Sequence, residues 1–215
     1  MARPRTSGPK KARRAEPEER RQAILEAGLS VFAASGFEAA KLDDVADKAG
    51  IAKGTIYLYF SDKHDLFEQI VRHAVTPVLG QLQSVVAIPD VPTEDLLARI
   101  FEVFRTEVLQ TDRKLVIRLV LTEGSRFPKI AAFYHREVIA KGLGLIRQVA
   151  ERAHARGELA SDEIKKFPHL VFAPLLLSVI WDGLFSRIEP LDVEGLLAAH
   201  RKVLIGSGSR RRTGK

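Results

Sequence analysis

Two short helical patterns separated by a glycine lie between residues 36 and 67. In the first, apolar residues recur at spacings of three and four, as along one face of a helix: Leu42, Val45, Ala46 and Ala49. Gly50 adopts a positive φ at low steric cost, so it predicts the end of this helix. Ile56 and Phe60 lie four residues apart in the next helical pattern and are expected to face inward. The whole pattern indicates a helix-turn-helix.

The outward face of the second helix is expected to carry a cation, a hydroxyl and two phenols: Lys53, Thr55, Tyr57 and Tyr59. Such groups suit phosphate oxygens and base edges in a major groove of DNA. Each of them alone fits an ordinary surface or half-buried position equally well. The apolar stripe, the turn glycine and this polar face agree with one another, which favours a DNA-reading unit.

Residues 52–67 resemble the recognition helix and the following helix start of the TetR/AcrR family of bacterial transcriptional regulators; they read AKGTIYLYFSDKHDLF. Residues 24–37 are similar to the first helix of that family. About a quarter of the chain carries the resemblance. It implies that six side chains touch DNA: Lys41, Lys53, Thr55, Tyr57, Tyr59 and Lys63.

Two positions depart from the family pattern. Lys41 stands where the family usually has a Ser or Thr that caps the second helix and contacts phosphate, so a weaker cap is expected. A lysine can still neutralise that phosphate. His64 stands where an acidic residue is usual, which affects the expected cap more than the DNA contact.

Composition and apolar run lengths limit the class of protein. The chain has 215 residues, of which 46% are hydrophobic and 28% charged, and it has no cysteine, which excludes disulfides and thiolate zinc sites. The longest apolar stretch, residues 170–181, is too short to span a bilayer and contains Pro174 and Ser178. The basic N-terminus lacks the apolar segment of a secretory signal. A cytoplasmic protein without a membrane partner is expected.

The net charge of +7 is concentrated at the two ends of the chain. Residues 1–15 and 207–215 together contain ten basic residues and no acidic one. The remaining 24 of the 34 basic residues face 27 acidic ones, so the body of the protein is slightly acidic. Both ends are expected to be disordered. They are either solvated tails or, for the arm beside the DNA-reading unit, additional DNA contacts.

The rest of the chain predicts an all-α fold of about nine helices: an N-terminal three-helix DNA-binding domain and a larger helical bundle for ligand binding and dimerisation. Helices are expected at about 16–36, 42–49, 52–60, 61–82, 93–108, 113–125, 127–156, 161–187 and 193–205. Pro77 is expected to bend the fourth. The expected organisation is a basic arm at 1–16, a helix-turn-helix domain at 17–65, a larger domain at 66–206 and a basic tail at 207–215.

The segment 167–185 is apolar nearly all round, so a helix there has to be covered on several sides. Its partners are either the rest of a monomeric bundle or a second subunit. The resemblance implies that the last two helices of each subunit pack as a four-helix dimer interface. We expect four residues in that interface: Leu176, Ile180, Leu184 and Leu197.

Nothing in the sequence predicts an enzyme. The six histidines are scattered over different expected helices without metal-ligand spacing, and there is no phosphate-binding loop, dinucleotide fingerprint or nucleophile elbow. No catalytic residue, metal site or cofactor is therefore expected. The better alternative is a constitutive DNA-binding structural protein, which differs from a regulator in that no small molecule changes its DNA affinity.

Residues 118–138 are similar to the sensing domain of some TetR-like regulators, although less specifically. Apolar walls with few polar groups suit a small-molecule site. The ligand pocket is expected among seven residues: Phe101, Phe104, Arg118, Thr122, Phe133, Glu137 and Phe172. The aromatic members could instead only fill a core. The resulting prediction is a repressor that binds a palindromic operator as a homodimer and is released by a small-molecule inducer.

Overall fold

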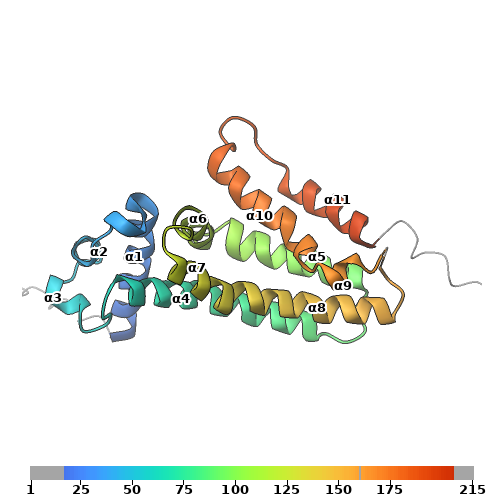
Figure 1. Ribbon diagram of the computed structural model, residues 1–215, viewed down its shortest axis with the longest axis horizontal. Coiled ribbons are helices and arrows are strands. Elements are labelled where there is room, and N and C mark those ends of the chain that lie inside the picture. Colours follow the sequence, from blue (N-terminus) through green and yellow to red (C-terminus); the bar gives the residue numbers. More distant parts are fainter. Residues whose placement is uncertain (1–16, 160, 206–215) are drawn as a thin grey trace, which may run out of the picture.

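The computed structural model describes residues 17–159 and 161–205, and all regular structure in these ranges is helical (Figure 1). The basic segments expected at 1–16 and 207–215 lie outside the described residues. The predicted all-α fold is confirmed. The helices, with two π-helical turns η1 and η2, are α1 (Pro17–Ala39), α2 (Leu42–Lys48), α3 (Lys53–Ile56), α4 (Lys63–Ala87), α5 (Thr93–Phe104), η1 (Arg105–Leu109), α6 (Arg113–Glu123), α7 (Pro128–Tyr134), η2 (His135–Ile139), α8 (Ala140–Ala155), α9 (Glu163–Lys166), α10 (His169–Leu184) and α11 (Val193–Ile205).

Helices α1, α2 and α3 gather at one end of the elongated molecule (Figure 1). Gly50 has a φ of 67° directly after α2, as the sequence predicts, since this conformation costs a glycine little. Gly36, with a φ of 76°, interrupts α1 rather than ending it, and the helix resumes as far as Ala39. Ile56 and Phe60 are buried, with exposed fractions of 0% and 1%.

Helix α4 connects this end to the rest of the molecule, where it runs beside α8 (Figure 1). Its first turn is capped by the Asp62 carboxylate, which accepts hydrogen bonds from the backbone N–H groups of His64 and Asp65. At its other end, the Arg152 guanidinium of α8 donates to the carbonyl oxygens of Val86 and Ile88 at 3.0 and 3.2 Å. Both ends of this long helix therefore have partners for the backbone groups that a helix leaves unpaired.

The buried apolar residues form two clusters. The first joins α1–α3 and the first half of α4 to Val116 and Leu119 of α6 and to Ile130 and Phe133 of α7. The second fills the space among α5, α8, α10, α11 and the end of α4. The helices of the N-terminal end thus share one core with α6 and α7.

Three expected helices differ in detail from those observed. The segments 93–108 and 127–156 continue as helix but pass through the π-helical turns η1 and η2. The segment 161–187 divides into α9 and α10 at Phe167, which has a φ of −124° and a ψ of 71°. The cause is Pro168, because a residue that precedes proline avoids the helical conformation.

Within residues 17–159 and 161–205, no helix combines the length and the apolar character that crossing a membrane requires.

Candidate functional site

Helix α3 continues past Ile56 as tight helical turns. The backbone N–H of Leu58 donates to the carbonyl of Thr55 at 3.1 Å, and that of Phe60 donates to Ile56 at 3.0 Å. Burial of Ile56 and Phe60 fixes the rotation of this segment, so the opposite side faces solvent. Tyr57 lies on that side, with 56% of its surface exposed.

Lys53 lies at the start of α3 and is held by two carboxylates of α2. Its ammonium nitrogen is 3.2 Å from Asp43 Oδ2 and 3.9 Å from Asp47 Oδ2. The hydrogen bond to Asp43, together with the nearby negative charges, raises the pKa of Lys53 above its ordinary value. Lys53 is therefore a permanent cation at the edge of the exposed face.

The remaining expected DNA contacts occupy different environments. Lys41 is exposed and precedes α2 in an extended conformation, and its side chain makes no capping hydrogen bond, in agreement with the weak cap expected from the sequence. Thr55 and Tyr59 are half-buried, and the Tyr59 ring lies 6.4 Å from that of Phe60. The exposed surface thus combines Lys41, Lys53 and Tyr57 with the edges of two half-buried side chains.

Lys63 has partners that the sequence did not predict. Its ammonium donates to the carbonyl oxygens of Phe37 at 2.9 Å and Glu38 at 2.6 Å, with a longer contact of 3.5 Å to Ala40. It also lies 5.0 Å from the centre of the Phe37 ring. A cation is favourable at the C-terminal end of a helix, where carbonyl groups are unpaired. Lys63 therefore joins the start of α4 to the end of α1.

A second set of contacts links this end of the molecule to the loop between α6 and α7. The ring of Phe127 lies 5.0 Å from that of Phe37, with the planes inclined at 65°. Next to this pair, the Arg126 guanidinium is ion-paired with the Glu38 carboxylate. The loop between α6 and α7 therefore contacts α1 directly, so that a displacement of either helix can be passed to α1.

The seven residues expected to line a ligand pocket do not form one group. Phe101, Phe104 and Phe172 belong to the second core cluster. Phe133 belongs to the first, where the guanidinium carbons of Arg72 and Arg136 lie 4.9 and 5.2 Å from its ring centre.

The three polar members of that set are bound to near neighbours. Thr122 is exposed, and its hydroxyl donates to the carbonyl of Arg118 at 3.1 Å. Glu137 accepts hydrogen bonds from Lys141 at 2.7 Å and from Arg136 at 3.1 Å, and these bonds, the one from Lys141 first, lower its pKa. Glu137 and Arg118 are therefore not each other's partner.

Arg118 pairs instead with Asp182 of α10. Its Nη2 atom lies 2.7 Å from Asp182 Oδ2, and Lys114 Nζ lies 2.8 Å from the same oxygen. Burial raises the pKa of Asp182, but the hydrogen bond from Lys114 and the charge of Arg118 outweigh it, so the pKa lies below its usual value. These ion pairs connect α6 with α10.

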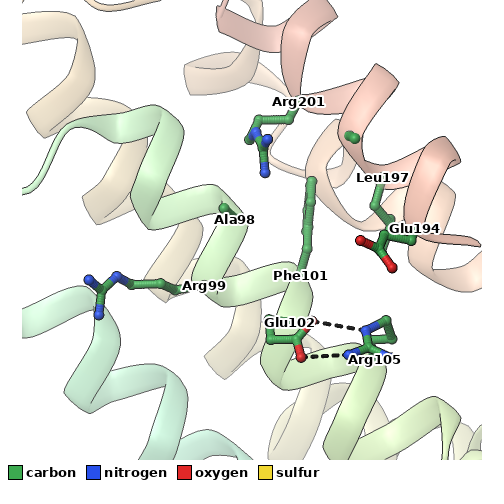
Figure 2. Close-up of a pocket in the computed structure, with 9 residues that line it drawn as sticks. Ala98, Arg99, Phe101, Glu102, Arg105, Glu194, Leu197 and Arg201 are labelled. Carbon is green, nitrogen blue, oxygen red and sulfur yellow. Dashed lines mark hydrogen bonds and ion pairs between the residues drawn. The ribbon is translucent and has the colours of Figure 1, made fainter.

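A groove of about 380 Å³ lies between α5 and α11 (Figure 2). Phe101 of α5 and Leu197 of α11 form much of its apolar wall. Charged residues surround it: Arg99, Glu102, Arg105, Glu194 and Arg201. Glu102 and Arg105 are paired with each other at 2.7 and 2.9 Å, whereas the buried Nε of Arg201 makes no hydrogen bond in the described structure and lies 3.8 Å from Glu94 Oε1. Phe101 is the one member of the expected ligand set that lines this groove.

The four residues expected at a dimer interface divide into two groups. Leu176 and Leu184 on α10 are exposed, by 41% and 66%, and Ile180 is half-buried. Leu197 is buried within its own subunit as part of the second core cluster. In the loop after α10, Ile188 is also exposed, by 82%.

Comparison with known proteins agrees with this arrangement. The model of the bacterial regulatory proteins of the tetR family matches residues 24–70, and that of the Tetracyclin repressor-like C-terminal domain matches residues 89–198. The chain belongs to the TetR family. This TetR-family protein is 32% identical to the HTH-type transcriptional repressor BepR of Brucella suis biovar 1 over 69% of its own length and 73% of that protein.

Two further relatives cover more of the chain. The HTH-type transcriptional regulator SrpR of Pseudomonas putida is 27% identical over 83% of this chain and 82% of its own. The crystal structure of FadR from Bacillus subtilis in complex with stearoyl-CoA shares the fold, with a TM-score of 0.72 and 17% identity over 86% of this chain and 97% of that one. This TetR-family chain is a helix-turn-helix transcriptional regulator that binds DNA.

Leu58 is a candidate that the sequence reasoning missed. It is 83% exposed and lies in the helical turns that follow α3, two residues after Ile56. The signal was present in the sequence, since position 58 lies opposite the inward-facing Ile56 and Phe60 on a helix. The expectation considered only polar side chains on this face. In the described ranges, no group of three or more potential metal ligands comes together.

Proposed function

We propose that this TetR-family regulator is a repressor that binds a palindromic operator as a homodimer and leaves it when a small molecule binds to the larger domain. The observation that carries the proposal is the outward face of α3, where Lys53 and Tyr57 are exposed on a rigid apolar base. Cations and phenols on such a face suit DNA backbone and base edges.

The dimer is supported by the uncovered apolar side of α10. Leu176 and Leu184 are exposed together with Leu177 and Ile188. Monomeric soluble proteins rarely leave large apolar patches uncovered. A two-fold dimer presents the same surface from both subunits and places two reading helices about 34 Å apart, as successive major grooves require. A palindromic operator follows from that symmetry.

The six expected DNA contacts are assigned different roles in this proposal. Lys53 and Tyr57 contact bases or phosphates directly, and Lys41 neutralises a phosphate. Thr55 and Tyr59 present their hydroxyl groups at the edge of the contact. The Lys63 ammonium donates two short hydrogen bonds to carbonyl groups of α1. Its third contact, from Nζ to the Ala40 carbonyl oxygen, is longer at 3.5 Å, so the proton of that contact is the one proposed to bind a phosphate.

The inducer site is proposed beside the second core cluster, in the groove between α5 and α11 (Figure 2). Phe101 lines this groove, and Phe104 and Phe172 pack in the core behind it. Of the other expected residues, Arg118 is placed to pass a change in α10 to α6 through Asp182. The other three expected residues do not line the groove in this proposal. They lie on helical segments that would move when the ligand binds: Thr122 on α6, Phe133 on α7 and Glu137 on η2.

The response has to reach α3 through the contacts at α1. A ligand acts only through different affinities for the DNA-binding and DNA-free states. The Phe127–Phe37 and Arg126–Glu38 contacts give α6 and α7 a route to α1, and α4 gives a second one as a lever. Small displacements matter because both half-sites have to be engaged at once.

The experiment begins with selection of an operator from random duplexes by the full chain. Binding to it is then measured at fixed salt with and without compounds that raise the thermal unfolding temperature of the protein. The proposal expects a palindromic site, a dimer on it, and at least one stabilising compound that weakens binding. A palindromic site bound equally well with every stabilising compound identifies a constitutive DNA-binding protein instead. Failure to select any sequence contradicts operator binding itself.

A further inference from the structure

The centre of the outward face of α3 is apolar. On a helix of 3.6 residues per turn, the positions directly opposite Ile56 and Phe60 are 54 and 58. Residue 58 is a leucine with 83% of its surface exposed, and residue 54 is a glycine. The polar side chains of Lys53 and Tyr57 lie together on one side of this line, and those of Thr55 and Tyr59 lie on the other.

The surroundings of the two central residues are open. A Cβ atom added to Gly54 would meet nothing within 4 Å, and Leu58 belongs to neither buried cluster. Packing within the subunit therefore requires neither the glycine nor the leucine. A single exposed leucine needs no explanation in general, but this one lies opposite the buried residues of the segment that the proposed operator binding turns toward DNA.

We propose that Leu58 is a specificity-determining residue that contacts the C5-methyl group of a thymine in the major groove, and that Gly54 lets the helix backbone approach the bases beside it. The inference rests on the proposed operator binding. A leucine side chain has no hydrogen-bond donor or acceptor, so it can read only the apolar feature of the groove. In unmodified DNA the one alkyl group at the base edges of the major groove is the thymine methyl.

The neighbouring side chains fit this assignment. Lys53 and Tyr57 lie four residues apart and therefore share one side of this line, where they can bind the phosphates that line the groove and help to fix the depth of the helix. The leucine then loses water on contact with the methyl group, which is a favourable change. The expected operator has one thymine in each half-site whose methyl group matters.

The test removes the methyl group from the DNA and the side chain from the protein separately. Each thymine of the selected operator is replaced in turn by deoxyuridine, which lacks only the C5-methyl. At the thymine that Leu58 contacts, wild type should bind about 4-fold more weakly per half-site, or about 15-fold when both half-sites are changed, from the usual gain for burying one methyl-sized group.

The Leu58→Ala variant should bind the thymine operator more weakly than wild type and should no longer distinguish deoxyuridine from thymine at that position. Leu121→Ala, which shortens a leucine that is 49% exposed on α6, is the matched control and should keep the full preference. Because Leu58 is exposed, its variant should unfold at the wild-type temperature.

Two results overturn the inference while leaving the proposed function intact. One is a palindromic operator on which no deoxyuridine substitution weakens wild-type binding. The other is a deoxyuridine effect of the same size in wild type and Leu58→Ala, which assigns the methyl contact to another residue. If no operator can be selected, the proposed function and this inference fail together.

Discussion

At the scale of single residues, Lys53 and Lys63 have the same side chain and the same expected contact with DNA but different partners within the protein. Lys53 is bound to carboxylates of α2, whereas Lys63 is bound to carbonyl groups of α1. No pattern in the sequence distinguishes them, because each partner depends on how two helices meet.

Lys53 has to leave Asp43 to reach a phosphate. Asp43→Asn removes that competitor and also a negative charge close to the DNA, so operator binding should become about 2- to 5-fold tighter. Lys53→Gln should weaken binding and lower the salt dependence by about one phosphate contact. Equilibrium titrations at several salt concentrations measure both effects, and looser binding by Asp43→Asn would contradict this view of Lys53.

Tyr57 is exposed and has no role in the core, so its substitution isolates DNA recognition from folding. Tyr57→Ala should weaken operator binding by roughly 1–3 kcal/mol, as expected for loss of a specific contact. Tyr57→Phe keeps the ring and reports on the hydroxyl group alone. Fluorescence anisotropy with the selected operator provides the measurement, and a normal affinity in Tyr57→Ala would remove this residue from the interface.

At the scale of elements, helix-forming patterns predicted most of what is observed. The stripe around Val45, the inward pair Ile56 and Phe60 and the glycine turn all appear where periodicity placed them. The candidate ligand residues could not be placed equally well, because periodicity gives the buried side of a helix but not the neighbour that covers it. Phe133 and Phe101 consequently lie in different cores.

Lys63 should stabilise the junction of α1 and α4. Lys63→Met retains an aliphatic chain of similar length but leaves the carbonyl groups of Phe37 and Glu38 without the ammonium, and the free energy of unfolding should fall by about 1–2 kcal/mol. Urea unfolding followed by circular dichroism checks this value. The same variant should lose about one phosphate contact in the salt dependence of DNA binding if the proposed third proton is used.

Asp182 should contribute to the stability of the contact between α6 and α10. Its folded pKa is lowered, so its contribution is present above the unfolded pKa, near 3.8, and is lost as the pH falls through the lower folded value. Because the side chain is 35% exposed and screened by solvent, Asp182→Asn should cost only about 0.5–1 kcal/mol at neutral pH. Unfolding free energies of the variant and wild type should converge once the pH falls below the folded pKa of Asp182. A constant difference down to acidic pH would rule out the charge as the cause.

At the scale of the whole molecule, the resemblance in one quarter of the chain predicted the family and the fold. The apolar segment 167–185 was expected to be covered on several sides. In the structure, one side of this helix is buried within the subunit and another side is exposed. Leu197 was assigned to the dimer interface because the family resemblance implies that the last two helices of each subunit form it. The packing of α11 against α5 places it inside instead.

The two leucines should therefore respond differently to substitution. Leu184→Glu, at an exposed position, should give a folded monomer with weak operator binding, because a carboxylate cannot be buried unpaired in an interface. Leu197→Ala should keep the dimer and lose about 2–4 kcal/mol of unfolding free energy, as for a cavity in a core. Sedimentation and chemical unfolding separate these outcomes. A monomeric wild type at micromolar concentration would contradict the first.

The core that α1–α3 share with α6 and α7 limits how this regulator can be re-engineered. A hybrid made by joining these reading helices to the larger domain of a relative directly after residue 65 would separate Phe37 from Phe127 and Glu38 from Arg126. We expect such a hybrid to fold poorly, and one that also transfers residues 113–134 to recover. The exchangeable module of this protein is thus made of two pieces that are far apart in the gene and adjacent in space.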